Sequence, residues 1–334
     1  MIISRRKLLG YGAGAASFLA APYVARAQGQ AIRLVFSHHV PTTHLAHVTA
    51  ERFAEQVKTL TNGQVTIDIR PASQLFNLRT SAEALQLGTL DLAWTDLGTL
   101  ANWQPQFGFT SVPFLFNDYD HVKKVLYGPV GESVVKDAKD TLGVDILCLG
   151  ASGFRIFVSK REIKNANDVR GIKLRVPEIP VYVEMARALG TNPTPIPAGE
   201  IYTALQTGVI DAFEGPADFV TTGKHYEVAK FMTRTHHIFT EVSIMGSVKK
   251  MASLPPNVQK AIRDAAVEQV SKYMWDANLK LQGDAWNELT SKATGNASPD
   301  VASFRSKMGP VIDSFVAKAG PKAKAYIEAV QKAA

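Results

Sequence analysis

The stretch Leu85-Gln86-Leu87-Gly88-Thr89-Leu90-Asp91 recurs 120 residues later as Leu205-Gln206-Thr207-Gly208-Val209-Ile210-Asp211. Each copy has the pattern of a helix that ends at a glycine cap, followed by a short strand with an aspartate at its start. Ahead of the second copy, Ala186–Gly190 and Thr194–Pro197 repeat the helix, glycine and strand order of Leu60–Ile69. A match this short also fits a common helix-to-strand corner. We favour the alternative, two similar α/β domains.

The residues around the first copy alternate between strand and helix patterns. Ala31–Phe36 and Val65–Ile69 have the β-rich or alternating character of strands, and a helix is expected between them through Glu51–Val57. A second helix over Ser81–Leu87 leads to a strand at Leu90–Trp94. This order predicts an α/β domain with a largely parallel sheet. Because such sheets bind ligands at the carboxyl ends of their strands, two domains of this kind predict a clamshell with a cleft between them.

The last third of the chain is expected to be helical. Leu254-Pro255-Pro256 can start a helix, since proline is tolerated in the first turn. Apolar residues then continue at helical spacing towards Leu289. A helix unbroken from Pro256 to Lys292 would be about 55 Å long, which is enough to cross both domains.

The chain has 334 residues, of which 46% are apolar and 20% are charged. This length makes two domains the default, and the composition excludes a disordered, collagen-like or disulfide-scaffold protein. Cys148 is the single cysteine and has no partner for an intramolecular disulfide. It lies in the apolar run Val144–Leu149, and we interpret it as a structural residue in a buried strand.

The first 27 residues have the three parts of an export signal. Ser4-Arg5-Arg6-Lys7 is basic, Leu8–Val24 is apolar, and Ala25-Arg26-Ala27 is a cleavage pattern. The paired arginines match the twin-arginine type, which predicts a periplasmic protein cleaved after Ala27. A non-cleaved anchor is the alternative. Removing residues 1–27 takes away four basic residues and no acidic one, which lowers the formal net charge from +7 to +3.

The remaining chain does not have the pattern of a nucleic-acid-binding or membrane-embedded protein. It has no cationic run interleaved with aromatic residues and no second apolar run of about 18 residues. It also has no strong catalytic motif and no pattern that requires a cofactor or metal. The pairs His38-His39 and His236-His237 are expected to be polar loop or strand-end residues, and Asp91 and Asp211 to bond turn amides.

One stretch has the character of a ligand site, Gly171-Ile172-Lys173-Leu174-Arg175-Val176-Pro177. Lys173 and Arg175 share one face of a strand because they are two residues apart. The guanidinium of Arg175 can hold a carboxylate with two parallel hydrogen bonds. Arg155 similarly interrupts an apolar run, Gly153–Phe157. By themselves, arginines on strands more often face solvent or form ion pairs.

At these residues the chain resembles the solute-binding proteins of TRAP transporters, the family first known for uptake of C4-dicarboxylates. The resemblance rests on Gly171–Pro177, Ala188–Pro195 and Glu200–Asp211, and it extends through Phe53-Ala54, Gln74-Leu75, Leu85–Gly88, Val112–Phe116 and Pro255-Pro256. It implies a periplasmic-binding-protein clamshell with crossing strands and a long hinge-spanning helix. The implied domains are 28–152 plus about 241–282, and 153–240 plus about 283–334.

The resemblance also implies a function and a site. Arg175 holds the carboxylate of a small organic acid as the cleft closes, Arg155 assists, and a membrane permease pair receives the ligand. Further residues are expected in the cleft by likeness of position or as aromatic walls: His39, Trp94, Asp96, Phe154, Glu178, Phe213, Glu214 and Gly215. Many relatives have Asn where this chain has Gly215, and sialic-acid receptors have Phe where it has Ala198, so sialic acid is disfavoured.

The ligand and the partner stay open at this point. A keto, hydroxy or aromatic monocarboxylate is the preferred ligand class, with a C4-dicarboxylate or a sugar acid as the alternative. Trp94, Phe154 and Phe213 fit an apolar ligand surface and a protein core equally well. An exported enzyme that uses Asp96, Glu178 or Glu214 as a base is the alternative from another class. A receptor that feeds a sensor is a third.

Overall fold

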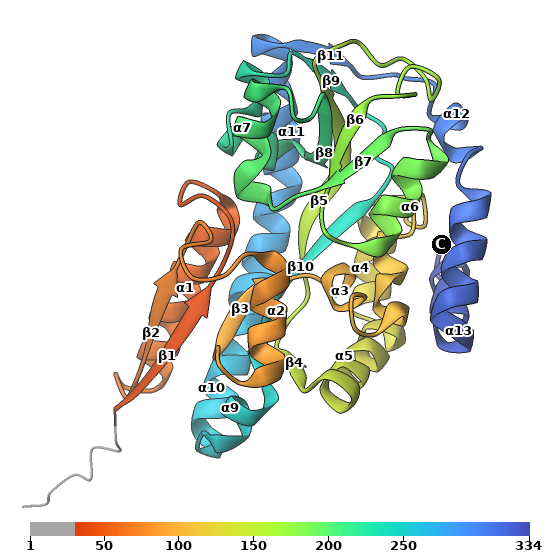
Figure 1. Ribbon diagram of the computed structural model, residues 1–334. Coiled ribbons are helices and arrows are strands. Elements are labelled where there is room, and N and C mark those ends of the chain that lie inside the picture. Colours follow the sequence, from red (N-terminus) through yellow and green to blue (C-terminus); the bar gives the residue numbers. More distant parts are fainter. Residues whose placement is uncertain (1–30) are drawn as a thin grey trace, which may run out of the picture.

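The computed structural model describes residues 31–334, so the predicted export signal lies outside the described residues. The strands join in one twisted sheet in the order β2-β1-β3-β10-β5-β8-β6-β7, with β4, β9 and β11 off this path (Figure 1). We call the part around β1 and β3 the first half and the part around β6 and β8 the second half. The predicted α/β class is confirmed.

The first half has the expected alternation of strands and helices. Strand β1 pairs in parallel with both β2 and β3. The elements are β1 (Ile32–Ser37), α1 (Leu45–Leu60), β2 (Val65–Arg70), α2 (Leu78–Leu87), β3 (Leu92–Thr95), α3 (Leu97–Leu100), η2 (Pro105–Ser111), α4 (Tyr119–Leu126), α5 (Pro129–Leu142) and β4 (Val144–Ile146).

The second half repeats this arrangement. Strand β6 pairs in parallel with both β7 and β8. The elements are β6 (Lys173–Val176), α6 (Pro180–Ala188), β7 (Asn192–Pro195), η3 (Ala198–Glu200), α7 (Ile201–Thr207), β8 (Ala212–Pro216), α8 (Ala217–Thr222), η4 (His225–Glu227), β9 (Phe231–Thr233), β11 (Thr294–Asn296) and α12 (Val301–Arg305). The last helix, α13 (Gly309–Lys332), packs on η2 and α5 of the first half as well as on α6.

Two long strands run between the halves. Strand β5 (Gly150–Ser159) pairs with β8, and β10 (Phe239–Ser247) pairs with β3, while the two strands pair antiparallel with each other. These are the crossing strands that the resemblance implies. The division into two domains at the predicted residues stays a prediction.

The long helix is continuous from Pro256 to Lys292, as its apolar spacing predicts. It comprises α10 (Pro256–Ala266), the wider π-helical segment η5 (Val267–Met274) and α11 (Trp275–Lys292). Figure 1 shows it running past both halves behind the sheet. Val258, Ile262 and Val270 pack on the first half, whereas Trp286 and Leu289 pack on the second.

The repeated corner is the same in both halves. Gly88 and Gly208 end their helices in the left-handed conformation, with φ of 79° and 78°, which glycine adopts without strain. The Asp91 carboxylate then accepts a hydrogen bond from the Val35 N–H of β1 at 2.8 Å. The Asp211 carboxylate accepts one from the Lys173 N–H of β6 at 3.1 Å. Both aspartates therefore bond a neighbouring strand rather than the turn amides that we expected.

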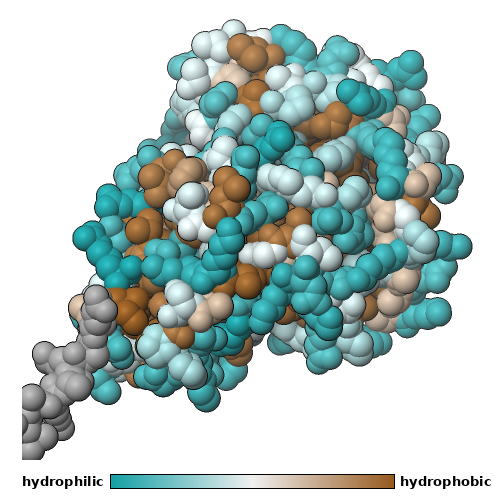
Figure 2. Space-filling model, turned by 60° about the horizontal axis from the view of Figure 1, so that its bottom comes forward, coloured by the Kyte–Doolittle hydropathy of each residue, from teal (hydrophilic) through white to brown (hydrophobic). Residues whose placement is uncertain are grey.

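The core and the surface have the ordinary distribution of residues. Cys148 is free and buried, as predicted, but β4 ends at Ile146 and Cys148 follows the strand rather than lying in it. Figure 2 shows hydrophilic residues spread over the visible face, with apolar residues in separate small groups. Within residues 31–334, none of the helices has the length and apolar character needed to cross a membrane.

We expect Asp91→Ala to lower the free energy of unfolding by about 1–3 kcal/mol, because the Val35 N–H loses a charged acceptor in a part-buried position. Asp211→Ala should cost less, since the Asp211 side chain is 37% exposed against 18% for Asp91. Urea unfolding of both variants measures the difference. An equal or larger loss for Asp211→Ala would contradict this account of the two corners.

Candidate functional site

A pocket lies between the two halves at the carboxyl ends of β1, β3, β6 and β8. Its volume is about 740 Å³, including the open mouth. The first half and the crossing strands contribute His39, Val40, His44, Ala46, Leu78, Trp94, Thr95, Asp96, Ser152, Arg155, Thr240 and Val242. The second half contributes Arg175, Pro177, Ile179, Tyr182, Ala198, Pro216 and Phe219. Five of the predicted site residues are therefore brought together here: His39, Trp94, Asp96, Arg155 and Arg175.

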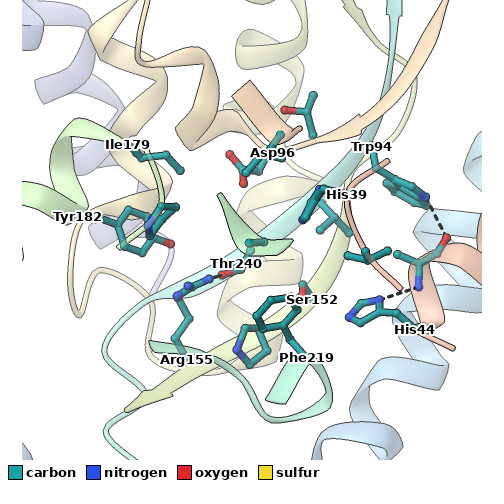
Figure 3. A pocket seen from close by; sticks show the side chains of 18 of the residues that line it. His39, His44, Trp94, Asp96, Ser152, Arg155, Ile179, Tyr182, Phe219 and Thr240 are labelled. Carbon is teal, nitrogen blue, oxygen red and sulfur yellow. Dashed lines mark hydrogen bonds between the residues drawn. The ribbon is translucent and has the colours of Figure 1, made fainter. Parts of the chain in front are cut away.

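Arg155 on β5 is already paired with a carboxylate. Its Nε and Nη2 contact the two carboxylate oxygens of Glu214 on β8, the Nη2–Oε1 distance being 2.9 Å. Its Nη1 donates to the Thr240 hydroxyl at 2.9 Å, which Figure 3 marks, and its guanidinium lies over the Tyr182 ring. Each of the three guanidinium nitrogens of Arg155 thus has a hydrogen-bond partner within the protein.

The Glu214 carboxylate is fully buried but stays ionised. Burial alone would raise its pKa, but the charge of Arg155 and hydrogen bonds from His237 and Arg155 lower it to about 2. Glu214 in turn raises the pKa of Arg155, against the effect of burial. The net charge of the pair is therefore zero across the physiological pH range.

Arg175 on β6 is the second buried guanidinium of the pocket, with 4% of its surface exposed. Its Nε donates to the Ile196 carbonyl at 2.9 Å. It forms no ion pair with any carboxylate in residues 31–334, and its Nη groups have no hydrogen bond there. Burial lowers its pKa to about 10, with Glu214 opposing this and Arg155 adding to it. Arg175 is therefore a cation at neutral pH with unused donors.

His39 and Trp94 line the side of the pocket opposite Arg155 (Figure 3). Burial lowers the pKa of His39 to about 3, and nearby His38, His44 and Arg175 add to this, so its imidazole is neutral. The His39 Nδ1 is buried without a protein partner. The indole N–H of Trp94 donates to the Ala46 carbonyl at 2.9 Å, which fixes the ring in place. His39 therefore has a free hydrogen-bonding atom, whereas Trp94 presents an apolar surface.

Asp96 and Glu241 form a pair of buried carboxyl groups beside the pocket. Asp96 caps α3 and accepts from the Thr99 N–H at 2.6 Å, and Glu241 accepts from the Leu97 N–H. Burial raises the pKa of Asp96. Burial also raises the pKa of Glu241, to about 8, and the nearby Asp96 carboxylate raises it further. The pair therefore holds a proton near neutral pH.

Five predicted residues do not line this pocket: Glu214, which pairs with Arg155, and the four that follow. Phe154 packs against Phe239 and His236, and Phe213 is fully buried against His225. Gly215 lies within β8 opposite Ile156. Glu178 lines a smaller adjoining pocket, which also borders on Arg175 and where Arg79 is 3.9 Å away. The structure thus places Phe154 and Phe213 in the core.

The structure adds lining residues that no sequence pattern indicated. Tyr182 and Ile179 come from the start of α6, and Phe219 from α8. His44 precedes α1 and caps it, since its Nδ1 accepts from the Ala46 N–H. The one sequence pattern that indicates this cap is a histidine directly before apolar residues at helical spacing. The described residues contain no group of three or more metal-ligating side chains that could hold a metal ion.

The raised pKa of Glu241 predicts that the folded protein loses stability as the pH rises towards 8. Because the folded pKa of Glu241 lies above its ordinary value, its contribution is complete at low pH and is lost as the pH rises through about 8. His38 and His39, whose pKa values are lowered, act in the opposite sense, but only below about pH 6.5. We expect the free energy of unfolding to fall between pH 6.5 and 8 by on the order of 1 kcal/mol.

Glu241→Gln is the matched control, because its amide oxygen can still accept from the Leu97 N–H. Chemical unfolding of this variant should show no such fall between pH 6.5 and 8. A wild-type protein whose stability is constant or rises over this range would overturn the assignment of the proton to the pair.

The comparisons with known proteins agree with this geometry. The chain is 30% identical over 283 residues to the 2,3-diketo-L-gulonate-binding periplasmic protein YiaO of Escherichia coli, covering 80% of this chain and 86% of that protein. The crystal structure of the sugar acid binding protein DctPAm of Advenella mimigardefordensis in complex with galactonate matches with a TM-score of 0.85 and 26% identity, covering 91% and 99% of the two chains. A TRAP periplasmic solute binding protein of Desulfovibrio salexigens with bound orotic acid matches with a TM-score of 0.84 and 28% identity, covering 90% and 98%.

The family model DctP, bacterial extracellular solute-binding protein family 7, matches residues 36–319. This match covers both halves, the crossing strands and every residue that lines the pocket. It decides between the receptor and the exported enzyme, since it is a family of solute-binding proteins. The chain belongs to the DctP family of TRAP periplasmic solute-binding proteins.

Proposed function

We propose that this protein captures the single carboxylate of a small organic acid with Arg175 and delivers the acid to a TRAP membrane permease. The observation that carries the proposal is the contrast between the two arginines. Each nitrogen of the Arg155 guanidinium has a partner in Glu214 or Thr240, whereas Arg175 is buried, charged and without a carboxylate partner in residues 31–334. A buried guanidinium of this kind is stabilised by an anion that binds with paired hydrogen bonds.

The charges around the pocket favour a monocarboxylate over a dicarboxylate. Arg155 and Glu214 cancel, which leaves the single charge of Arg175 for the ligand. Asp96 and Glu241 lie beside the pocket and hold a proton between them, so the pair carries at most one negative charge. That charge would repel a second carboxylate. A C4-dicarboxylate would therefore leave one carboxylate buried without a cation, which is costly.

The rest of the lining supports a hydroxy or keto acid. His39 has an unpartnered ring nitrogen, and Asp96 and Ser152 add further polar groups for hydroxyls. The relatives that bind 2,3-diketo-L-gulonate and galactonate favour the sugar-acid alternative, since both ligands are sugar acids. Such ligands also have one carboxylate and several oxygen substituents, which suits the same lining. An aromatic monocarboxylate is the second candidate. It is favoured by the Trp94 and Phe219 rings in the lining and by the relative that holds orotic acid.

Closure of the two halves around the acid completes the proposed mechanism. The halves would move as domains 28–152 plus about 241–282 and 153–240 plus about 283–334, hinged at β5, β10 and the long helix. Closure excludes water and so strengthens the contact between Arg175 and the carboxylate. Delivery to a permease requires export to the periplasm, for which residues 1–27 carry the predicted twin-arginine signal, cleaved after Ala27.

A thermal-shift and calorimetry screen of residues 28–334 tests the proposal with aldonic, uronic, keto, aromatic and C4-dicarboxylic acids. We expect monocarboxylates to bind and Arg175→Ala to weaken binding by about 30-fold to several thousand-fold, as for a lost buried charge pair of about 2–5 kcal/mol. Arg175→Lys should restore only part of the affinity, because an ammonium cannot form the paired hydrogen bonds.

Arg79→Ala is the control, since Arg79 is half exposed and lies near Glu178 outside the main pocket. Its affinity should stay within about twofold of the wild type. Binding that survives in a folded Arg175→Ala variant, or a dicarboxylate that binds more tightly than its monocarboxylate analogue, would contradict the proposal.

A further inference from the structure

A buried polar contact joins the two halves beside the pocket. His44 belongs to the first half, just before α1, and Asp218 belongs to the first turn of α8 in the second half. The His44 Nε2 lies 3.2 Å from the Asp218 Oδ2, and the two side chains are 3% and 2% exposed. The alignment falls short of a regular hydrogen bond, and neither atom has another partner in the described residues. In this arrangement the two atoms therefore depend on each other.

The other polar atoms of both residues are already used. The His44 Nδ1 accepts from the Ala46 N–H at 3.1 Å, so the hydrogen of a neutral ring is assigned to Nε2, the atom next to Asp218. The Asp218 Oδ1 accepts from the Gln282 side chain at 2.8 Å. His44 is thus held by its own helix start and Asp218 by the long helix.

Gln282 of α11 holds Asp218 in place. Besides Asp218, its amide nitrogen donates to the Ser152 carbonyl of β5 at 2.8 Å. Its amide oxygen accepts from the Ala217 N–H at 3.1 Å. Asp218 is therefore tied through Gln282 to α11 and to β5, two of the elements at which the halves would be hinged. A carboxylate held in this way is pre-organised for the His44 N–H.

The contact also shapes the pocket. The ring of Phe219, next to Asp218, packs edge-on against the His44 ring with centroids 6.5 Å apart, and both side chains line the pocket (Figure 3). Gly215 leaves room for this arrangement, since a Cβ at that position would lie 3.2 Å from the Phe219 ring. Separation of His44 from Asp218 would open this wall.

We propose that His44 and Asp218 form a latch that holds the two halves together and keeps the closed arrangement populated without ligand. The latch rests on the proposed function, because it presumes that the halves open and close around the pocket. The exposed contact between Arg79 and Glu178, at 3.9 Å, also joins the halves but is screened by water. Of these two contacts the buried one is the stronger restraint, since loss of one partner leaves the other polar atom buried and unpaired. A hydrogen bond from the Asn102 side chain to the Glu178 carbonyl, at 2.9 Å, and apolar packing of α6 also join the halves.

Spin labels at Lys58→Cys on α1 and Gln206→Cys on α7 report the opening in the ligand-free protein by pulsed electron paramagnetic resonance. Both positions are exposed, and the native Cys148 is buried. We expect a closed population in the otherwise unchanged protein and a decrease of about five- to fiftyfold in its ratio to the open form in Asp218→Asn. Asparagine keeps the shape of the aspartate side chain. Its NH2 group, however, must face one of two other donors, the His44 Nε2 or the Gln282 amide nitrogen.

His44→Asn is the second variant, because asparagine is a good helix cap but is too short to reach Asp218. It should lower the closed population as Asp218→Asn does, and Arg79→Ala should not. A ligand-free protein that is entirely open, or a closed population that neither variant changes, would overturn the latch. These distances need no ligand, so the result is independent of whether Arg175 binds a carboxylate.

Discussion

Two guanidinium groups are buried at one pocket, and the fold supplies a carboxylate for only one of them. Arg155 and Glu214 lie on paired strands, β5 and β8, where Arg155 stands opposite Pro216 and Glu214 opposite Phe157. Their contact neutralises both charges in a water-poor region, Arg155 also donates to the Thr240 hydroxyl, and the His237 Nε2 lies 3.5 Å from the Glu214 carboxylate. Because the Arg155–Glu214 pair is neutral, the positive charge of Arg175 stays uncompensated within the described part of the chain. Without Glu214 the pocket would hold two unpaired cations, and it would suit a different class of anion.

The two-fold construction of the chain brings these groups together. Each half ends a helix at a left-handed glycine and then uses an aspartate to bond the start of a neighbouring parallel strand. The carboxyl ends of the parallel strands in both halves consequently meet at the same pocket, which is where open α/β sheets bind ligands. Crossing strands and one continuous helix connect the halves. Apolar packing of α6 on α3 and η2 adds a further contact between the halves.

Much of this could be predicted from local patterns in the sequence. The repeat at Leu85 and Leu205 predicted the corners, and the apolar spacing after Pro256 predicted the continuous helix. The partners of Arg155 could not be predicted in this way, because Glu214 meets Arg155 through strand pairing across 59 residues. For the same reason the pattern could not distinguish Phe154 and Phe213, which are in the core, from Phe219, which lines the pocket. The sequence around an aromatic residue has the same pattern whether the residue packs in the core or lines a pocket.

The most direct test of the account is a crystal structure of residues 28–334 with the acid that gives the largest thermal shift. The account predicts one carboxylate within hydrogen-bond distance of the Arg175 Nη atoms, with Arg155 still paired to Glu214. A carboxylate bound to Arg155 with Glu214 displaced, or a ligand that leaves Arg175 without an anion, would contradict it.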